Sequence, residues 1–161
     1  MGHALKCEPA FPKICFLDIE TAPINGLSWG LRETDVIHVL RDTYLLCFAY
    51  KWLGEKKVHT KALCDFPSYR RNKHSDKPLA EALWDVFDQA DIIIAHNGDN
   101  FDIKKTLARF LVHVLKRPTP TKTIDTHKIA RAKFKFDNNK LDNLAGYLGI
   151  GHKLPHTGKH L

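Results

Sequence analysis

The sequence predicts a single α/β domain built on a mixed β-sheet, and three observations lead to that class. Strand-like segments come first along the chain, a helix with one apolar face follows, and strands and helices then alternate. The predicted order β-β-β-α-β-α-β-α-α is typical of a mixed sheet with helices packed on its faces. With 161 residues and no internal repeat or linker, the chain is long enough for one ordinary core. We therefore expect one domain over residues 1–161.

The first half of the chain predicts a central strand and an antiparallel meander. Ile14-Cys-Phe-Leu17 is apolar and flanked by turn formers, so residues 14–20 are expected to form a central strand. Residues 36–52 predict two strands joined by a tight turn at Arg41-Asp42, and residues 57–63 predict a third. The polar stretch 65–77 predicts a loop.

Helical periodicity begins at Pro78, which is tolerated in a first turn, with Ser75 or Asp76 as the expected cap. A buried strand is predicted at residues 91–95, and Asn100 is a candidate cap for the next helix, which Pro118 would stop. The apolar faces of the two helices are Leu79, Leu83, Val86, Phe87 and Ala90, and then Ile103, Leu107, Phe110, Leu111 and Val114.

The last part of the chain predicts a short strand and two short helices. The strand is expected at residues 121–126 and the helices at residues 126–134 and 140–148. Gly149 stands where a C-cap glycine belongs, and residues 150–161 carry little hydrophobic pattern.

Composition excludes several classes of protein. Hydrophobic residues make up 43% and charged residues 27%, which excludes a disordered or collagen-like chain. No apolar run approaches the length of a membrane helix, and residues 1–13 lack the apolar core of a secretory signal, so we expect a soluble cytoplasmic protein without a membrane partner. The four cysteines contain no C-x-x-C pair, which disfavours a zinc ribbon and a disulfide framework.

Positive charge is concentrated in one stretch. Net charge is +7, but residues 103–140 hold eleven Lys and Arg against two Asp, an excess of +9 that leaves −2 for the rest. Such a field attracts polyanions, although a solubilising surface would look the same.

Two carboxylates are predicted on one face of the first strand. Asp18 and Glu20 are two residues apart, so their side chains point the same way. They repel each other unless a cation lies between them, and oxygen ligands suit Mg²⁺ or Mn²⁺. The alternative is a strand that ends near Ile19 and leaves Glu20 exposed.

A second acidic cluster, His96-Asn-Gly-Asp-Asn-Phe-Asp102, lies between a predicted strand and a predicted helix. Ligand sites of α/β proteins tend to lie at such junctions. Asp102 is the candidate ligand and Asp99 the alternative. Asp102 could instead be an ordinary acidic residue in the first turn of a helix.

Four segments together resemble the motifs of DEDD-type 3′–5′ exonucleases. The first is Phe16-Leu-Asp-Ile-Glu-Thr-Ala-Pro23, and the second is Ile94-Ala-His-Asn-Gly-Asp-Asn-Phe-Asp102. Thr123-Ile-Asp-Thr126 resembles the strand that follows the second motif, and Lys140 to Ile150 resembles the helix that leads toward the third. The resemblance covers residues 14 to about 160.

The resemblance implies a ribonuclease H-like fold: a mixed five-stranded sheet with an antiparallel three-stranded meander and helices on both faces. It also implies hydrolysis of 3′ ends of single-stranded DNA, or of RNA, with two Mg²⁺ or Mn²⁺ ions about 3.5–4 Å apart. Asp18 would bridge the ions, Glu20 would hold one ion and the 3′-hydroxyl, and Asp102 would anchor the second ion. Implied contacts to nucleic acid are Thr21, Ala22, Asn97, Phe101, Lys104 and Lys105. A bacterial or phage origin and a polymerase or other replication partner are further expectations.

The family's fourth carboxylate, in a Tyr-x-x-x-Asp or His-x-x-x-x-Asp pattern, has no counterpart, because the last acidic residue is Asp142. Three explanations stay open: a chain that is C-terminally incomplete or split, a silent relative that still binds nucleic acid, or a substitute residue. His152, His156 and His160 are expected in a loop because Pro155 and Gly158 oppose a helix, and one of them could act as a general base.

Two functions from other classes remain beside the exonuclease. One is a nucleic-acid-binding or protein-interaction module on the same fold. The other is an endonuclease or resolvase of the wider ribonuclease H-like group, which the spacing of the three acids fits less well.

Overall fold

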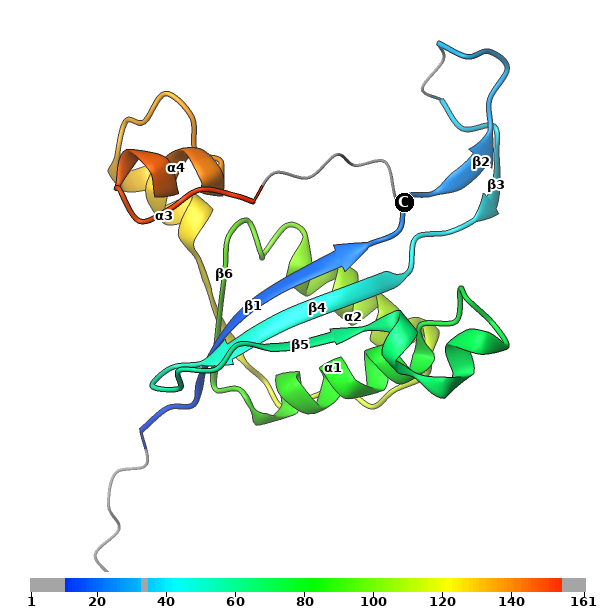
Figure 1. Cartoon of the computed structure of the whole chain (residues 1–161), viewed down its shortest axis with the longest axis horizontal. Coiled ribbons are helices and arrows are strands. Elements are labelled where there is room, and N and C mark those ends of the chain that lie inside the picture. Colours follow the sequence, from blue (N-terminus) through cyan, green and yellow to red (C-terminus); the bar gives the residue numbers. More distant parts are fainter. Residues whose placement is uncertain (1–10, 33–34, 155–161) are drawn as a thin grey trace, which may run out of the picture.

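The computed structural model describes residues 11–32 and 35–154 and is centred on a mixed five-stranded sheet (Figure 1). The strand order is β5-β4-β1-β6-β7. Pairing is antiparallel for β1 with β4 and for β4 with β5, and parallel for β1 with β6 and for β6 with β7. The strands are β1 (Ile14–Thr21), β4 (Leu45–Trp52), β5 (His59–Ala62), β6 (Ile92–Ala95) and β7 (Lys122–Asp125). The predicted α/β class, with its mixed five-stranded sheet and its three antiparallel strands, is confirmed.

Strand β1 alternates strictly between a buried and an exposed face, as a strand with one covered face must. Cys15, Leu17 and Ile19 are buried in the core, whereas Phe16, Asp18 and Glu20 are exposed. β1 pairs with β4 along its whole length beyond Ile14, but it pairs with β6 only over residues 14–16. The carboxyl half of β1 therefore has no strand beside it on the β6 side.

Helices α1 (Lys77–Gln89) and α2 (Asp102–Val112) supply the core that covers the buried face of β1. The predicted apolar positions of α1 are buried, and Phe87 meets Phe110 of α2 edge-on with ring centroids 5.4 Å apart. Asp76 is the N-cap residue of α1, but its side chain makes no cap hydrogen bond. Phe101, rather than Asn100, is the N-cap residue of α2.

A two-stranded ribbon of β2 (Asn25–Leu27) and β3 (His38–Arg41) projects beyond the carboxyl end of β1, at the upper right of Figure 1. The prediction that residues 36–52 add two strands to the meander is therefore half wrong, because β3 pairs with β2 instead. A side chain at Gly26 would collide with Val36 and with the backbone of His38, so the absence of a Cβ permits this pairing.

One short 3₁₀ turn, Leu63–Asp65, leads into the predicted loop 65–77, and a second, Pro67–Arg70, lies within it. After β7 come the two predicted short helices, α3 (Thr126–Lys133) and α4 (Leu141–Tyr147), at the upper left of Figure 1. Gly149 has φ +67° and its amide donates to the carbonyl of Gly146, which confirms the predicted C-cap. We call residues 126–150 the α3–α4 lobe.

Cys15, Cys47 and Cys64 are free thiols, while Cys7 lies outside the described residues. Burial raises the pKa of Cys15 to about 12, so this thiol behaves as a small hydrophobic side chain. Among the described helices, none is long and apolar enough to cross a bilayer.

Candidate active site

Asp18 and Glu20 lie side by side on the exposed face of β1. The strand continues to Thr21, so the alternative of a strand that ends at Ile19 is wrong. Their partners across the ladder on β4 are the small residues Ala49 and Cys47. Because these neighbours are small, a cavity of about 350 Å³ lies over the two acids, and Lys61 and Asp65 also line it.

Asp102 reaches the same strand from the other direction. It is the first residue of α2, it is 4% exposed, and its Oδ1 accepts a hydrogen bond of 3.0 Å from the backbone amide of Ile19. That amide belongs to the half of β1 that β6 does not reach, so the carboxylate completes the free edge of the strand. Asp102 is therefore a long-range partner of β1 and more than an ordinary first-turn acid.

Burial and neighbouring negative charge raise the pKa values of Asp18 and Asp102. Burial, and then the Glu20 charge, raise the pKa of Asp18, while Lys153 acts in the opposite direction. Burial raises the pKa of Asp102 to about 6, with a further increase from the Asp18 charge that the hydrogen bond from Ile19 opposes. Mutual repulsion of this kind is what a bound cation would relieve.

The loop between β6 and α2 is held by Asp125, at the end of β7. Asp125 is buried, and its carboxylate accepts from the amides of Asn97 (2.9 Å), Asp99 (3.3 Å), His127 (3.0 Å) and Lys128 (3.3 Å). Sequence reasoning treated Asp125 only as part of a strand motif. Its position directly before a helix was an N-cap signal that could have identified it.

His96 and Asp99 tie this loop to the α3–α4 lobe. Nδ1 of His96 lies 2.9 Å from the Thr126 hydroxyl, and Nε2 lies 2.9 Å from the carbonyl oxygen of Asn139. Asp99 forms an ion pair of 2.6 Å with Lys128, and this hydrogen bond lowers the pKa of Asp99. Since its carboxylate already has a cation, Asp99 is a poorer metal ligand than Asp102.

Two of the predicted nucleic-acid contacts are already engaged within the fold. The amide of Ala22 donates to the Tyr44 carbonyl and the Ala22 carbonyl accepts from the Thr43 hydroxyl, each at 2.8 Å, so the amide has no proton left for a nucleotide, whereas the carbonyl oxygen can accept a second hydrogen bond. Asn97 has φ 64°, and its Oδ1 accepts from Asn100 Nδ2 at 3.3 Å.

The other predicted contacts present side chains near the first turn of α2 or at the end of β1. Phe101 and Lys104 are exposed, whereas Thr21 and Lys105 are half-buried. Lys104 Nζ lies 3.5 Å from Asn100 Oδ1. These four residues stay candidates for contacts with a strand near Asp102.

A network of ion pairs and hydrogen bonds around the buried Asp76 joins elements of the core, and the sequence did not predict it. Asp76 is fully buried and bonds Arg109 Nε at 2.8 Å, Arg109 Nη2 at 2.6 Å, His113 Nε2 at 2.7 Å and the amide of Leu45 at 2.8 Å. Burial alone would raise the pKa of Asp76, but the hydrogen bonds, first of all that from Arg109, lower it. The network joins α1, α2 and the start of β4.

The donor chemistry of the three acids fits Mg²⁺ or Mn²⁺, because hard divalent ions prefer carboxylate oxygens. Within residues 11–32 and 35–154, however, no three His, Cys, Asp or Glu side chains lie close enough to hold one ion. Asp102 approaches the edge of β1, whereas Asp18 and Glu20 project from its face. Asp18, Glu20 and Asp102 therefore lie near one another, but in this conformation they do not converge on one point that a single ion could occupy.

His152 lies in irregular chain after α4, as predicted for a loop histidine, and its ring packs against Gly146. Its Nδ1 lies 3.9 Å from Asp142, whose Oδ1 also accepts from the Lys153 amide at 2.6 Å. Asp142, in the first turn of α4, thus bonds the chain that follows this helix. His156 and His160 lie outside the described residues.

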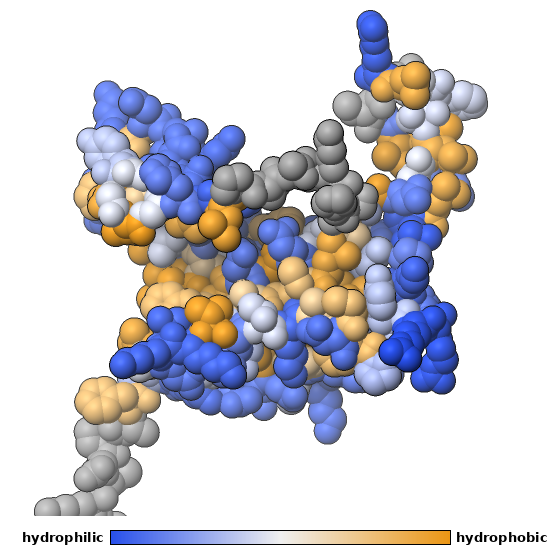
Figure 2. All heavy atoms as spheres, in the orientation of Figure 1, coloured by the Kyte–Doolittle hydropathy of each residue, from blue (hydrophilic) through white to orange (hydrophobic). Residues whose placement is uncertain are grey.

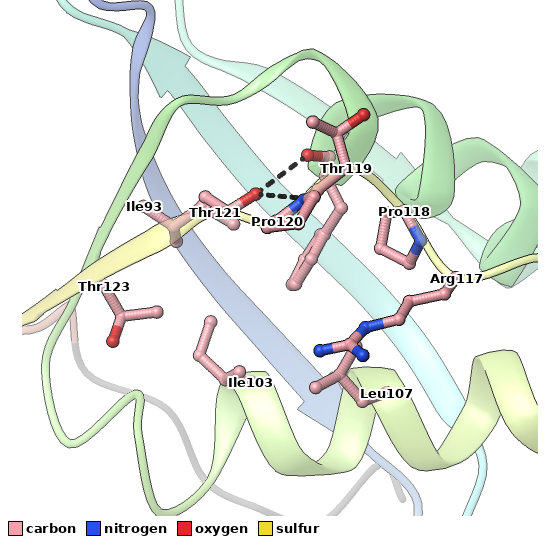
Figure 3. Close-up of a pocket in the computed structure, with 10 residues that line it drawn as sticks. Ile93, Ile103, Leu107, Arg117, Pro118, Thr119, Pro120, Thr121 and Thr123 are labelled. Carbon is pink, nitrogen blue, oxygen red and sulfur yellow. Dashed lines mark hydrogen bonds between the residues drawn. The ribbon is translucent and has the colours of Figure 1, made fainter.

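A different cavity, of about 160 Å³, lies between α2 and the segment before β7. Figure 3 shows Ile103 and Leu107 of α2 opposite Pro118 and Thr121, with the Arg117 guanidinium at one end. Its lining contains no carboxylate, and Ile93 places it on the buried face of the sheet. It is separate from the acidic cavity.

The sheet order and the acidic central strand define a ribonuclease H-like domain. The family model of the RNase H superfamily matches residues 15–160, and the chain belongs to that superfamily. No curated protein matches the chain. A solved structure of the family B DNA polymerase from the hyperthermophilic archaeon Pyrobaculum calidifontis is similar in fold, with a TM-score of 0.63 at 15% identity. The match covers 89% of this chain and 19% of the polymerase.

Proposed function

We propose that the protein is a metal-dependent exonuclease that removes nucleotides from the 3′ ends of single-stranded DNA or RNA. The proposal rests on one observation: the buried Asp102 carboxylate accepts a hydrogen bond from the amide of Ile19, and Ile19 is the residue between Asp18 and Glu20 on β1. Membership of the RNase H superfamily supports a nucleic-acid substrate. The basic stretch 103–140 supports it independently, because it supplies the charge that phosphates require.

Each residue of the proposed site has a distinct role in binding metal or nucleic acid. Asp18, Glu20 and Asp102 would hold divalent metal, which when bound supplies charge neutralisation and activation of water. Glu20, on the exposed face, would accept a hydrogen bond from the 3′-hydroxyl. Lys61 lines the same cavity and is a cation for the adjacent phosphate. Phe101, at the start of α2, offers an exposed ring to the terminal base.

A second candidate function is a nucleic-acid-binding module without hydrolysis. The specific observation in its favour is that the described residues contain no ready set of three metal ligands. Asp142, the last acid in the sequence, accepts a hydrogen bond from the Lys153 amide, which argues against it as a substitute for the fourth carboxylate. As part of the exonuclease proposal we also retain a replication protein as the partner and the bacterial or phage cytoplasm as the location.

The test uses 5′-labelled single-stranded DNA and RNA with Mg²⁺ or Mn²⁺. We expect a ladder that shortens from the 3′ end, disappears with chelator, and falls at least about 100-fold in Asp18→Asn and Asp102→Asn. Asp85→Asn, an exposed acid of α1, is the matched control and should keep full activity. Intact substrate that is nevertheless bound would favour the silent module instead.

A further inference from the structure

The α3–α4 lobe contains an aromatic cluster that the proposed active site does not use. Phe134 and Phe136 have ring centroids 5.5 Å apart, and Phe136 meets Tyr147 edge-on at 5.4 Å. Tyr147 is 79% exposed and Phe134 is 59% exposed. Large exposed rings are costly in water, so a cluster of them indicates a surface that meets a partner.

A cavity of about 190 Å³ opens beside this cluster. Phe136 and Tyr147 line it with the amides of Asn138 and Asn143 and the side chain of Lys135. An apolar cavity of about 150 Å³ admits one benzene ring, so there is room here for one flat ring with polar groups at its edge. A nucleobase has that chemistry.

The lobe that contains the cavity carries more Lys and Arg than Asp and Glu. Arg131, Lys133 and Lys135 are exposed, and none of the three forms an ion pair within the described residues. Asp137 is the acidic side chain in the lining. Figure 2 shows hydrophilic side chains over much of this lobe, at the upper left of the view. Free cations beside exposed rings are typical of surfaces that bind single strands.

The lobe is also fixed relative to the carboxylates. Asp125 and His96 join it to the loop that ends at Asp102, through the amide of His127 and the carbonyl oxygen of Asn139. A polymer held on the lobe would therefore keep a constant relation to β1.

We propose that the α3–α4 lobe holds a single-stranded polynucleotide upstream of its 3′ end, with one base against Tyr147 and Phe136 and the phosphates on Lys133 and Lys135. The direction of the strand, with its 3′ end toward β1, rests on the proposed function, but the binding itself requires no hydrolysis. Stacking is indifferent to the sugar, so DNA and RNA share this chemistry.

The experiment measures fluorescence anisotropy of labelled dT₁₂ and rU₁₂ with the full chain in chelator. We expect Tyr147→Ala to weaken binding about tenfold and Tyr147→Phe to keep it within about twofold, since the ring rather than the hydroxyl carries the contact. Phe11→Ala is the control for an exposed ring elsewhere, because Phe11 is 91% exposed and precedes β1. It should leave affinity unchanged for both polymers.

Charge is tested by the dependence of affinity on salt. Lys135→Gln should lower the slope of log affinity against log salt by about 0.7 for a single strand, whereas Lys57→Gln in the β4–β5 turn should not change it. Thermal unfolding of each variant confirms that it is folded.

Equal affinity of Tyr147→Ala and the parent chain would overturn the proposal, as would an equal loss in Phe11→Ala. Binding of a glutamate-rich peptide in place of both polynucleotides would overturn it too. Because the assay contains no metal, a chain that binds in this way but produces no ladder would refute the exonuclease and leave the lobe site standing.

Discussion

Asp102 and Ile19 are joined across 83 positions of the sequence by a hydrogen bond of 3.0 Å, from the backbone amide of Ile19 to Oδ1 of Asp102. The bond completes the edge of β1 where β6 no longer reaches it. It also holds the Asp102 carboxylate in a buried position near Asp18, and burial, with a smaller contribution from the Asp18 charge, raises the pKa of Asp102. Without a bound cation, the ionised Asp102 therefore lowers the free energy of unfolding relative to a protein with an uncharged side chain at this position.

Asp102→Asn should therefore stabilise the metal-free protein while it removes activity. An ordinary aspartate has a pKa of 3.8, and Asp102 has one of about 6, so its charge disfavours folding above pH 6 and the cost disappears as pH falls toward 4. The asparagine oxygen keeps the bond to Ile19. We expect a gain of about 3 kcal/mol at pH 8 and little change at pH 4, measured by urea unfolding in chelator. A loss of stability at pH 8 would contradict this electrostatic account.

Divalent metal should stabilise the chain through the same carboxylates. Mn²⁺ at 100 times its dissociation constant adds about 2.7 kcal/mol to a protein that binds it only when folded. We expect the unfolding temperature to rise with Mn²⁺ in the parent chain and in Asp85→Asn. It should rise much less in Asp18→Asn and Glu20→Gln, because each removes a ligand. The same rise in all four proteins would locate the metal elsewhere.

The network around Asp76 should dominate stability at low pH. Asp76→Asn removes the counter-charge of the mostly buried Arg109 guanidinium and should cost about 3 kcal/mol in urea unfolding. Since hydrogen bonds lower the folded-state pKa of Asp76, its contribution is complete above pH 4 and is lost as pH falls through the lowered value. Glu81→Gln, which breaks only the exposed pair with Lys77 at 3.9 Å, should cost less than about 0.5 kcal/mol.

Asp125 should control the order of the loop that precedes Asp102. Asp125→Ala leaves four backbone amides without their acceptor, whereas Asp125→Asn retains one carbonyl oxygen. Hydrogen exchange should accelerate at Asn97, Asp99, His127 and Lys128 in the alanine variant, and less in the asparagine variant. Unchanged exchange at these amides would show that other contacts hold the loop.

The fold was predictable where local pattern and tertiary structure agree. The alternation of β1 and the apolar face of α1 are visible in the sequence, and the structure confirms them. The predicted apolar face of the second helix is wrong in part: Phe110 is buried and Ile103 packs against the core, but Leu107, Leu111 and Val114 are exposed. The β2–β3 ribbon was not predictable, because pairing of Gly26 with Val39 depends on close approach at a glycine. Periodicity cannot show which partner a short strand will choose.

The site was predictable only in part, for a similar reason. Asp18, Glu20 and Asp102 stand out by residue type at strand and helix ends. The long-range roles of Asp76 and Asp125 depend on partners between 26 and 37 positions away, which local sequence does not reveal. Only the N-cap role of Asp125, toward His127 and Lys128, has a local signal. The engaged backbone of Ala22 likewise follows from the position of Tyr44, which only the folded chain defines.

The most direct test of the central claim is a crystal of the protein soaked in Mn²⁺ and measured at a wavelength where manganese scatters anomalously. The account predicts anomalous density beside β1, within coordination distance of Asp18 and of at least one of Glu20 and Asp102, and no such density in Asp18→Asn. Manganese density elsewhere, or none at these three side chains in the parent protein, would contradict the claim.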